Sequence, residues 1–127
     1  MTEINISVVQ KYFQAYADKD RAAIEGVVDE TLRFTSPRDN RIDRATYFRR
    51  CWKNNEAIVG RKMIHILADG ERVFVAYELA WATGRASRNM ELFTLRNGKI
   101  VDVEVYFGWS IPHDAPEGGF VDQKADR

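Results

Sequence analysis

The hydrophobic pattern of this chain changes its period near Gly60. Before that point apolar residues recur at helical spacing, as at Val8, Tyr12 and Tyr16, which indicates helices with one buried face. After it apolar and polar residues alternate, as in the segment 73–83, which indicates strands with one buried face. Helices in one half and strands in the other predict an α+β fold rather than repeated β-α-β units.

Three helices are predicted in the first half, each preceded by a residue that can cap it. A strand covering residues 32–36 lies between the second and third helices and ends at Pro37. The predicted helices are residues 6–17 after Asn5, a second after Asp20, and a third after Asp43 that carries Trp52 and stops near Asn54 and Asn55.

The second half is predicted to be an antiparallel sheet. Short turns at 68–70 and 96–98 contain Asp69-Gly70 and Asn97-Gly98, which are typical of hairpins. In the last strand, alternation places Asp102 and Glu104 on the outer face. The predicted strands are residues 63–67, 73–83, 89–96 and 100–107.

Length and composition limit the classes of protein to consider. With 127 residues, one domain covering residues 1–127 is expected. Nineteen basic and nineteen acidic residues leave no net charge, which argues against nucleic acid as the partner. The start carries no signal-peptide pattern and no apolar run has membrane-spanning length, so we expect a cytoplasmic protein without a membrane partner.

Three short segments, in this order and spacing, carry a resemblance to a known family. Tyr12 follows Val8-Val9-Gln10-Lys11, Ser36-Pro37 ends a strand, and Glu91 lies in Met90-Glu91-Leu92-Phe93. Over residues 6–110 the chain resembles the ketosteroid isomerases and SnoaL-like polyketide cyclases of the nuclear transport factor two-like superfamily. The remaining tail, 111–127, is expected to be loop.

The resemblance implies a cone, in which three N-terminal helices pack on a curved, mostly antiparallel sheet around a deep apolar pocket. It also implies a homodimer formed through the convex sheet face, where we expect Leu92, Tyr106 and Trp81. In such isomerases a carboxylate removes a proton beside a carbonyl, while a tyrosine and a protonated acid stabilise the oxyanion. The ligand would be a small apolar molecule of polyketide or steroid type.

Carried over to this chain, the resemblance makes Tyr12 the oxyanion donor and Glu91 the acid. Tyr12 is equally explained as a core tyrosine at helical spacing. Glu91 interrupts an apolar strand, and burial would raise its pKa, so that it could serve as a neutral donor or as a base. The alternatives for Glu91 are an ion pair with an arginine or an outward-facing position.

The position of the family's base is occupied by Ser36, whose hydroxyl is not a base unless another group activates it. Ser36 is therefore expected to orient a ligand. Asp39, three residues later, is a candidate replacement for the base, and its alternative role is to form a turn. The full set of expected ligand-binding residues is Tyr16, Phe34, Ser36, Trp52, Phe93, Val103, Val105 and Phe107.

Two further patterns leave alternatives open. Glu78 faces solvent if Tyr77 and Leu79 face the core, and faces the pocket in the register that the resemblance implies; burial of apolar surface favours the first. The segment 38–53 holds six basic residues against two acidic ones. It is either a solvated helix face or a positive mouth that attracts a carboxylate-bearing substrate.

The sequence predicts neither a metal site nor a cofactor. His65 and His113 are far apart, and no acidic or thiol side chain stands at metal-ligand spacing from them. The leading hypothesis is a cofactor-free isomerase, cyclase or dehydratase that uses a tyrosine and an acid. The alternatives are a ligand-binding module that has lost the base and a dimerisation or interaction domain.

Overall fold

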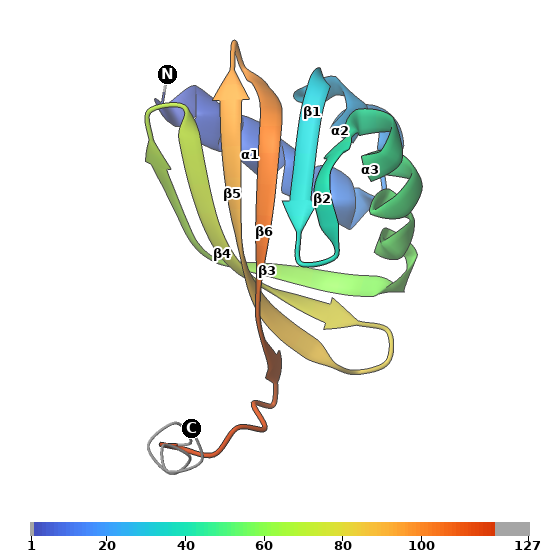
Figure 1. Cartoon of the computed structure of the whole chain (residues 1–127), viewed down its shortest axis with the longest axis vertical. Coiled ribbons are helices and arrows are strands. Elements are labelled where there is room, and N and C mark those ends of the chain that lie inside the picture. The colour runs from blue at the N-terminus through green and yellow to red at the C-terminus, as the bar shows by residue number, and fades with distance from the viewer. Residues whose placement is uncertain (1, 119–127) are drawn as a thin grey trace.

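We describe residues 2–118 from a computed structural model (Figure 1). Helices occupy most of the first half and long strands the second, as the change of period near Gly60 predicts. The elements are α1 (Thr2–Asp18), α2 (Arg21–Val27), β1 (Val28–Ser36), β2 (Asp39–Asp43), α3 (Arg44–Arg50), a 3-10 helix η1 (Trp52–Ala57), β3 (Ile58–Asp69), β4 (Arg72–Trp81), β5 (Ala86–Arg96) and β6 (Lys99–Ile111).

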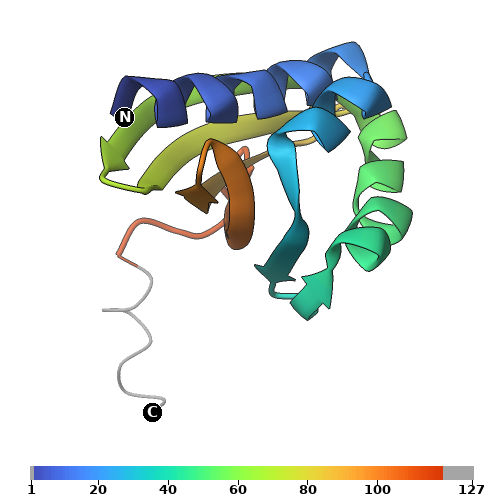
Figure 2. The ribbon, with the colours of Figure 1, turned by 90° about the horizontal axis from the view of Figure 1, so that it is seen from above.

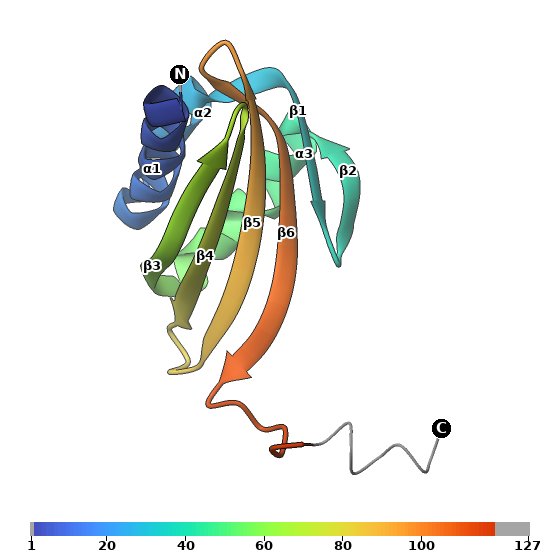
Figure 3. The same ribbon diagram turned by 90° about the vertical axis from the view of Figure 1, so that its left-hand side faces the viewer.

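The six strands form one curled sheet in the order β2-β1-β6-β5-β4-β3. Neighbouring strands are antiparallel except β1 and β6, which are parallel. Figures 1 and 3 show the long strands curving together, with α1 on one side of the sheet. Figure 2 shows α1 and α3 arranged around the concave face. This is the predicted α+β cone with three N-terminal helices.

The three helices are positioned by caps and by one apolar face. Asp20 and Asp43 accept hydrogen bonds from the backbone N–H groups of Ala23 and Thr46, so the two predicted caps are confirmed. The prediction for Asn5 is wrong, because α1 begins at Thr2 and Asn5 lies within it. Its buried amide instead donates to the carbonyl of Gly70, which ties α1 to the β3–β4 turn.

Five residues that were assigned to no helix or strand from the sequence, Asp39–Asp43, form the short edge strand β2. Its register pairs Phe34 with Ile42 and Ser36 with Asp39, with a bulge between the two pairs. The segment has no alternation of apolar residues, because only Ile42 packs against the core. Pairing with β1, rather than a hydrophobic pattern, therefore makes these residues a strand.

The register of β4 decides the orientation of Glu78. Val73, Val75, Tyr77 and Leu79 are buried on the concave face, while Glu78 lies on the outer face in an ion pair with Arg88. Burial of the more apolar face therefore decides the register, as expected. Trp81 follows the same alternation onto the concave side, so its predicted place on the convex face is wrong.

The β5–β6 hairpin is confirmed at the predicted position. Asn97 and Gly98 have φ values of 53° and 74°, the left-handed pair that a two-residue hairpin turn requires. β6 then continues beyond the predicted strand to Ile111, and residues 112–118 lead away from the sheet (Figure 3). None of the helices within residues 2–118 is long and apolar enough to cross a membrane.

Candidate functional site

A cavity of about 390 Å³ opens on the concave face of the sheet. Its floor is formed by inward-facing residues of β4, β5 and β6, and its walls by α1, β1 and the segment around η1. The wall is largely aromatic and aliphatic but holds two acids, Asp39 and Glu91, and two arginines, Arg38 and Arg61. A mainly apolar cavity with a few convergent polar groups is the usual form of a small-molecule site.

Glu91 is the central polar group of this cavity. Its side chain is 5% exposed, and its Oε1 accepts a hydrogen bond of 2.6 Å from the Tyr77 hydroxyl. Burial raises the pKa of Glu91 to about 7, because the ionised form loses its hydration; the hydrogen bond from Tyr77 and the charge of Arg61 act in the opposite direction. Near neutral pH this carboxyl can therefore both take and give a proton.

Three tyrosine hydroxyls meet at the α1 side of the cavity. The Tyr47 hydroxyl lies 2.7 Å from that of Tyr12 and is also hydrogen-bonded to that of Tyr16. Burial raises the pKa of Tyr12 and Tyr47 well above the ordinary value and that of Tyr16 to about 12, so all three stay protonated.

Two hydrogen bonds use only two of the three phenolic protons in this cluster. Tyr47 is fully buried, and leaving its proton without an acceptor would be costly. The favoured arrangement has Tyr47 donating to one neighbour and accepting from the other. The neighbour that accepts, either Tyr12 or Tyr16, then has an O–H group free for a ligand, since both line the cavity.

The position where relatives of this type are expected to carry a base forms a separate polar cluster. The Ser36 hydroxyl accepts from the backbone N–H of Arg38 and donates to Oδ2 of Asp39 at 2.9 Å. Nη2 of Arg50 lies 3.0 Å from Oδ1 of Asp39. The two side chains form an ion pair, but the contact does not have the geometry of a hydrogen bond. Asp39 thus lines the cavity while it is engaged by Ser36 and Arg50, and the Ser36 proton is used in the bond to Asp39.

Cys51 completes the wall beside this cluster, with its Sγ 3.9 Å from Oδ2 of Asp39. Burial and the neighbouring carboxylate raise the pKa of its thiol to about 12. A thiol that stays protonated is a poor nucleophile, and Cys51, which follows α3, packs against the hydrophobic core.

The structure brings together most, though not all, of the residues expected at the site. Three of them lie outside the set that lines the cavity: Phe93 packs edge-on against Tyr12, Val103 is fully buried, and Trp52 packs on Tyr16. They support the wall from behind. The expected residues that do line the cavity are Tyr12, Tyr16, Phe34, Ser36, Asp39, Glu91, Val105 and Phe107.

Three important residues were missed in the sequence. Tyr77 could have been found, because the favoured β4 register already turns it toward the face that carries Glu91. Tyr47 was recognised only as part of a helix face, and its distance from Tyr12 in the chain hides their contact. Arg61 lies near the start of β3, before the strand predicted over residues 63–67, so no alternation of apolar and polar residues indicated its orientation.

Metal-binding groups do not gather at this site. Within residues 2–118 no three histidine, cysteine or acidic side chains are close enough together to hold a metal ion. The polar groups of the cavity instead suit proton transfer and hydrogen bonding to an organic ligand.

A curled α+β sheet closed by three helices over an acid- and tyrosine-lined cavity defines the nuclear transport factor two-like class of domains. The chain belongs to the family of SnoaL-like domains, whose model matches residues 9–103. None of the curated proteins matches the sequence.

Solved structures of this fold resemble the chain closely in shape. A nuclear transport factor two-like protein of unknown function from Burkholderia xenovorans has a TM-score of 0.72 at 24% identity, over 95% of this chain and 92% of that one. A proposed ketosteroid isomerase from Kribbella flavida has a TM-score of 0.72 at 20% identity, over 84% of this chain and 79% of that one. A proposed polyketide cyclase from Xanthomonas campestris has a TM-score of 0.70 at 20% identity, over 84% of this chain and 92% of that one. At these identities the likeness establishes the fold.

Proposed function

We propose that the protein binds a small apolar molecule of polyketide or steroid type in this cavity and that Glu91 moves a proton on it without a cofactor. The observation that carries the proposal is the buried carboxyl of Glu91, with a pKa near 7, on the wall of an open apolar cavity. The reaction would be an isomerisation, a cyclisation or a dehydration, each of which begins with removal of a proton beside a carbonyl.

The tyrosine cluster supplies the second part of this chemistry. Removing a proton beside a carbonyl develops negative charge on its oxygen, which a hydrogen-bond donor in a dry site stabilises. The free O–H of Tyr12 or Tyr16 is such a donor. Tyr77 would act as a positioning residue, because it holds one oxygen of Glu91 and leaves the other for the ligand.

The remaining wall would bind the ligand's body. Phe34, Val105 and Phe107 offer apolar surface, and Ser36 lines the cavity at the end of β1, beside Asp39. Asp39 was a candidate for the base; because it is engaged by Ser36 and Arg50, we propose that it fixes that end of the cavity and that Glu91 takes the proton. The cytoplasmic location stays a prediction of the sequence.

A binding module without turnover is the alternative function, and one observation favours it. Ser36 stands where the base of an isomerase is expected, and its proton is used in the bond to Asp39. In that case Glu91 and the tyrosines would bind the oxygen of a phenol or enone without any reaction following.

The two functions can be separated with 2-tetralone, a bicyclic ketone with acidic protons beside its carbonyl. Proton NMR in D2O follows the exchange of these protons, whatever the later reaction is. We expect the protein to accelerate exchange, and Glu91→Gln to lower that acceleration at least about 100-fold. Glu78→Gln, on the opposite face of the sheet, is the matched control. Binding of tetralone without accelerated exchange would establish the binding-module alternative instead.

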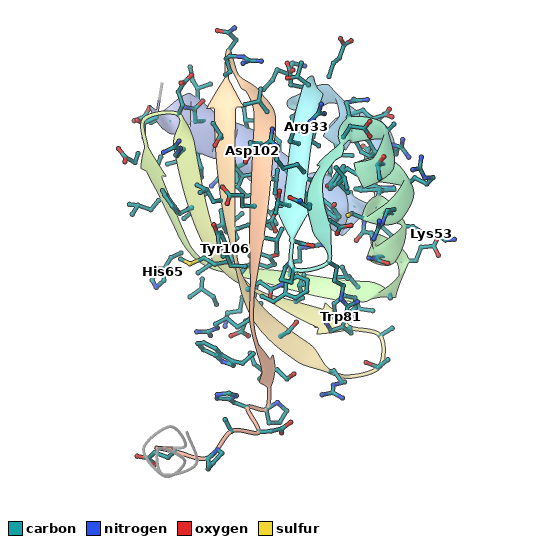
Figure 4. All side chains as sticks on the ribbon, viewed as in Figure 1. Arg33, Lys53, His65, Trp81, Asp102 and Tyr106 are labelled. Carbon is teal, nitrogen blue, oxygen red and sulfur yellow. The ribbon has the colours of Figure 1, made fainter. Side chains whose placement is uncertain are left out.

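We also propose a homodimer formed through the convex face. Phe74 pairs with Leu92, and Met90 pairs with both Ala76 and Tyr106, so five residues form one continuous apolar surface across β4, β5 and β6. Tyr106 is 54% exposed and Met90 49% exposed. Figure 4 shows Tyr106 on the side of the sheet away from α1. Exposed apolar surface of this extent is typical of an interface.

Sedimentation equilibrium at micromolar concentration tests this assembly. We expect a dimer for the wild type and a monomer for Leu92→Arg, which would put a long charged side chain into the apolar surface of the interface. Val59→Arg, at an exposed apolar position outside this surface, should remain dimeric. A monomeric wild type would contradict the proposal.

A further inference from the structure

Arg61 is a cation on the concave face that forms no ion pair with the acidic side chains of residues 2–118. The β3 register sets it opposite Leu79, whose side chain is buried in the cavity wall, and Arg61 itself lines the cavity. Its guanidinium lies 4.2 Å from the centre of the Tyr16 ring. Its one hydrogen bond, to Oδ1 of Asn55, is long at 3.4 Å. Among residues 2–118 no carboxylate lies within ion-pair distance of it.

The two acidic side chains of the cavity are already engaged. Asp39 is paired with Arg50, and Glu91 accepts from Tyr77. A guanidinium carries five N–H donors in a plane, of which Arg61 uses one. The four unused donors of this half-buried cation are not sealed from water, so a ligand that enters the cavity can reach them.

We infer that Arg61 binds the carboxylate of the natural ligand, which is therefore a small apolar molecule bearing one carboxyl group. This rests on the proposed function and names the substrate class of the same cavity. The stacking on Tyr16 fixes the plane of the guanidinium, so that its remaining N–H pairs can take a planar carboxylate in a bidentate way. Arg38, exposed at the same cavity and without an ion-pair partner among the described residues, would attract the anion toward it.

The cavity suits a single negative charge better than a phosphate. Glu91 and Asp39 line the same cavity, and these two acidic side chains would repel a dianion more strongly than a monoanion. The rest of the lining is aromatic and aliphatic and matches a hydrocarbon body. Arg61 also lies close enough to Glu91 to act on its pKa, so the bound carboxylate and the proton-transfer group would share one cavity.

A matched pair of probes tests this inference by calorimetry: 2-naphthoate and its methyl ester, which share a ring system and differ in charge. We expect the wild type to bind 2-naphthoate about 10- to 100-fold more tightly than the ester, the difference that hydrogen bonds to a charged group make. Arg61→Met, which keeps the apolar stem over Tyr16, should remove this preference while binding of the ester is retained. Arg61→Lys should keep part of the preference.

Lys62→Met is the control, because it removes one positive charge from the neighbouring, outward-facing position of the same strand. It should leave the preference unchanged. Equal binding of the two probes to the wild type, or a preference that survives in Arg61→Met, would overturn the inference while leaving the apolar cavity of the proposed function intact. Binding of neither probe would overturn both.

Discussion

The hydroxyl of Tyr77 donates a hydrogen bond of 2.6 Å to Oε1 of Glu91 across two neighbouring strands. In the β4–β5 register Tyr77 is opposite Asn89 and Glu91 is opposite Val75, so the two side chains meet diagonally on the concave face. This contact orients the carboxyl at the bottom of an apolar cavity. The bond and the charge of Arg61 limit how far burial raises the pKa of Glu91.

Replacing Tyr77 with Phe should make Glu91 a weaker acid. The hydrogen bond favours the ionised carboxylate, so its loss should raise the pKa of Glu91 above 7 by about one pH unit or more. If Glu91 acts as the base, the pH profile of tetralone proton exchange should move to higher pH by the same amount. Tyr106→Phe, an exposed tyrosine bonded to Glu104, should leave the profile in place. An unmoved profile in Tyr77→Phe would mean that another group accepts the proton.

Glu91 should also make the folded protein less stable as the pH rises. Below the ordinary pKa of 4.5 both folded and unfolded chains hold the proton. Between 4.5 and about 7 only the folded chain holds it, so the free energy of unfolding falls with pH and then levels off. The loss corresponds to about 3 kcal/mol.

Urea titrations of wild type and Glu91→Gln across pH 4 to 8 check this. Glutamine does not ionise, so the wild-type value minus the variant's should fall through that window by about 3 kcal/mol. The groups that face Glu91 are Tyr77 on β4, Arg61 on β3, Tyr12 and Tyr16 on α1 and Tyr47 on α3. Burial raises the pKa of each of these tyrosines above its ordinary value of 10, outside this pH window, so the slope belongs to Glu91. If the free energies of unfolding of wild type and Glu91→Gln changed in parallel with pH, the carboxyl of Glu91 would be in contact with water.

Tyr47→Phe should destabilise the fold by about 1–3 kcal/mol. The change removes one hydroxyl but both bonds of the cluster, leaving the buried hydroxyls of Tyr12 and Tyr16 without their shared partner. Thermal or urea unfolding measures it, with Tyr106→Phe expected to lie within about 0.5 kcal/mol of wild type. A neutral Tyr47→Phe would mean that the cluster contributes nothing to stability.

Ser36→Asp tests whether the missing base can be restored. Because Ser36 donates to Asp39, the single change would set two carboxylates side by side and should destabilise the protein. Adding Asp39→Asn removes that repulsion. We expect the double variant to accelerate tetralone exchange about 100-fold or more over wild type, the usual contribution of a positioned base. Asp39→Asn alone is the control, and a double variant no faster than it would contradict the predicted geometry at this position.

The general fold was predictable because periodicity reports which face of each element is buried. The registers of β4 and β5 followed from the apolar character of Val73, Val75 and Phe93. β2 was not predictable, because its backbone pairs with β1 while its side chains carry no pattern. Asn5 was misjudged because a polar residue near a helix start usually caps it, whereas here a contact with distant Gly70 decides its place.

The site was predictable only where a local pattern exposed a residue. Glu91 stood out as an acid within an apolar strand, and the resemblance brought Tyr12 and Ser36 to notice. The partners that set their chemistry, Tyr77 and Tyr47, come from other elements and look like ordinary core residues in the sequence. Such contacts follow from packing in three dimensions, which periodicity does not encode.

The most direct test of the account is the ionisation of Glu91 itself. Carbon-13 NMR of protein labelled at the glutamate side-chain carboxyl, with Glu91→Gln to assign the signal, follows this group through a pH titration. The account predicts a midpoint near pH 7, because the carboxyl is buried beside Tyr77 in the cavity. A midpoint near the ordinary value of 4.5 would place the carboxyl in water and would contradict its role in proton transfer.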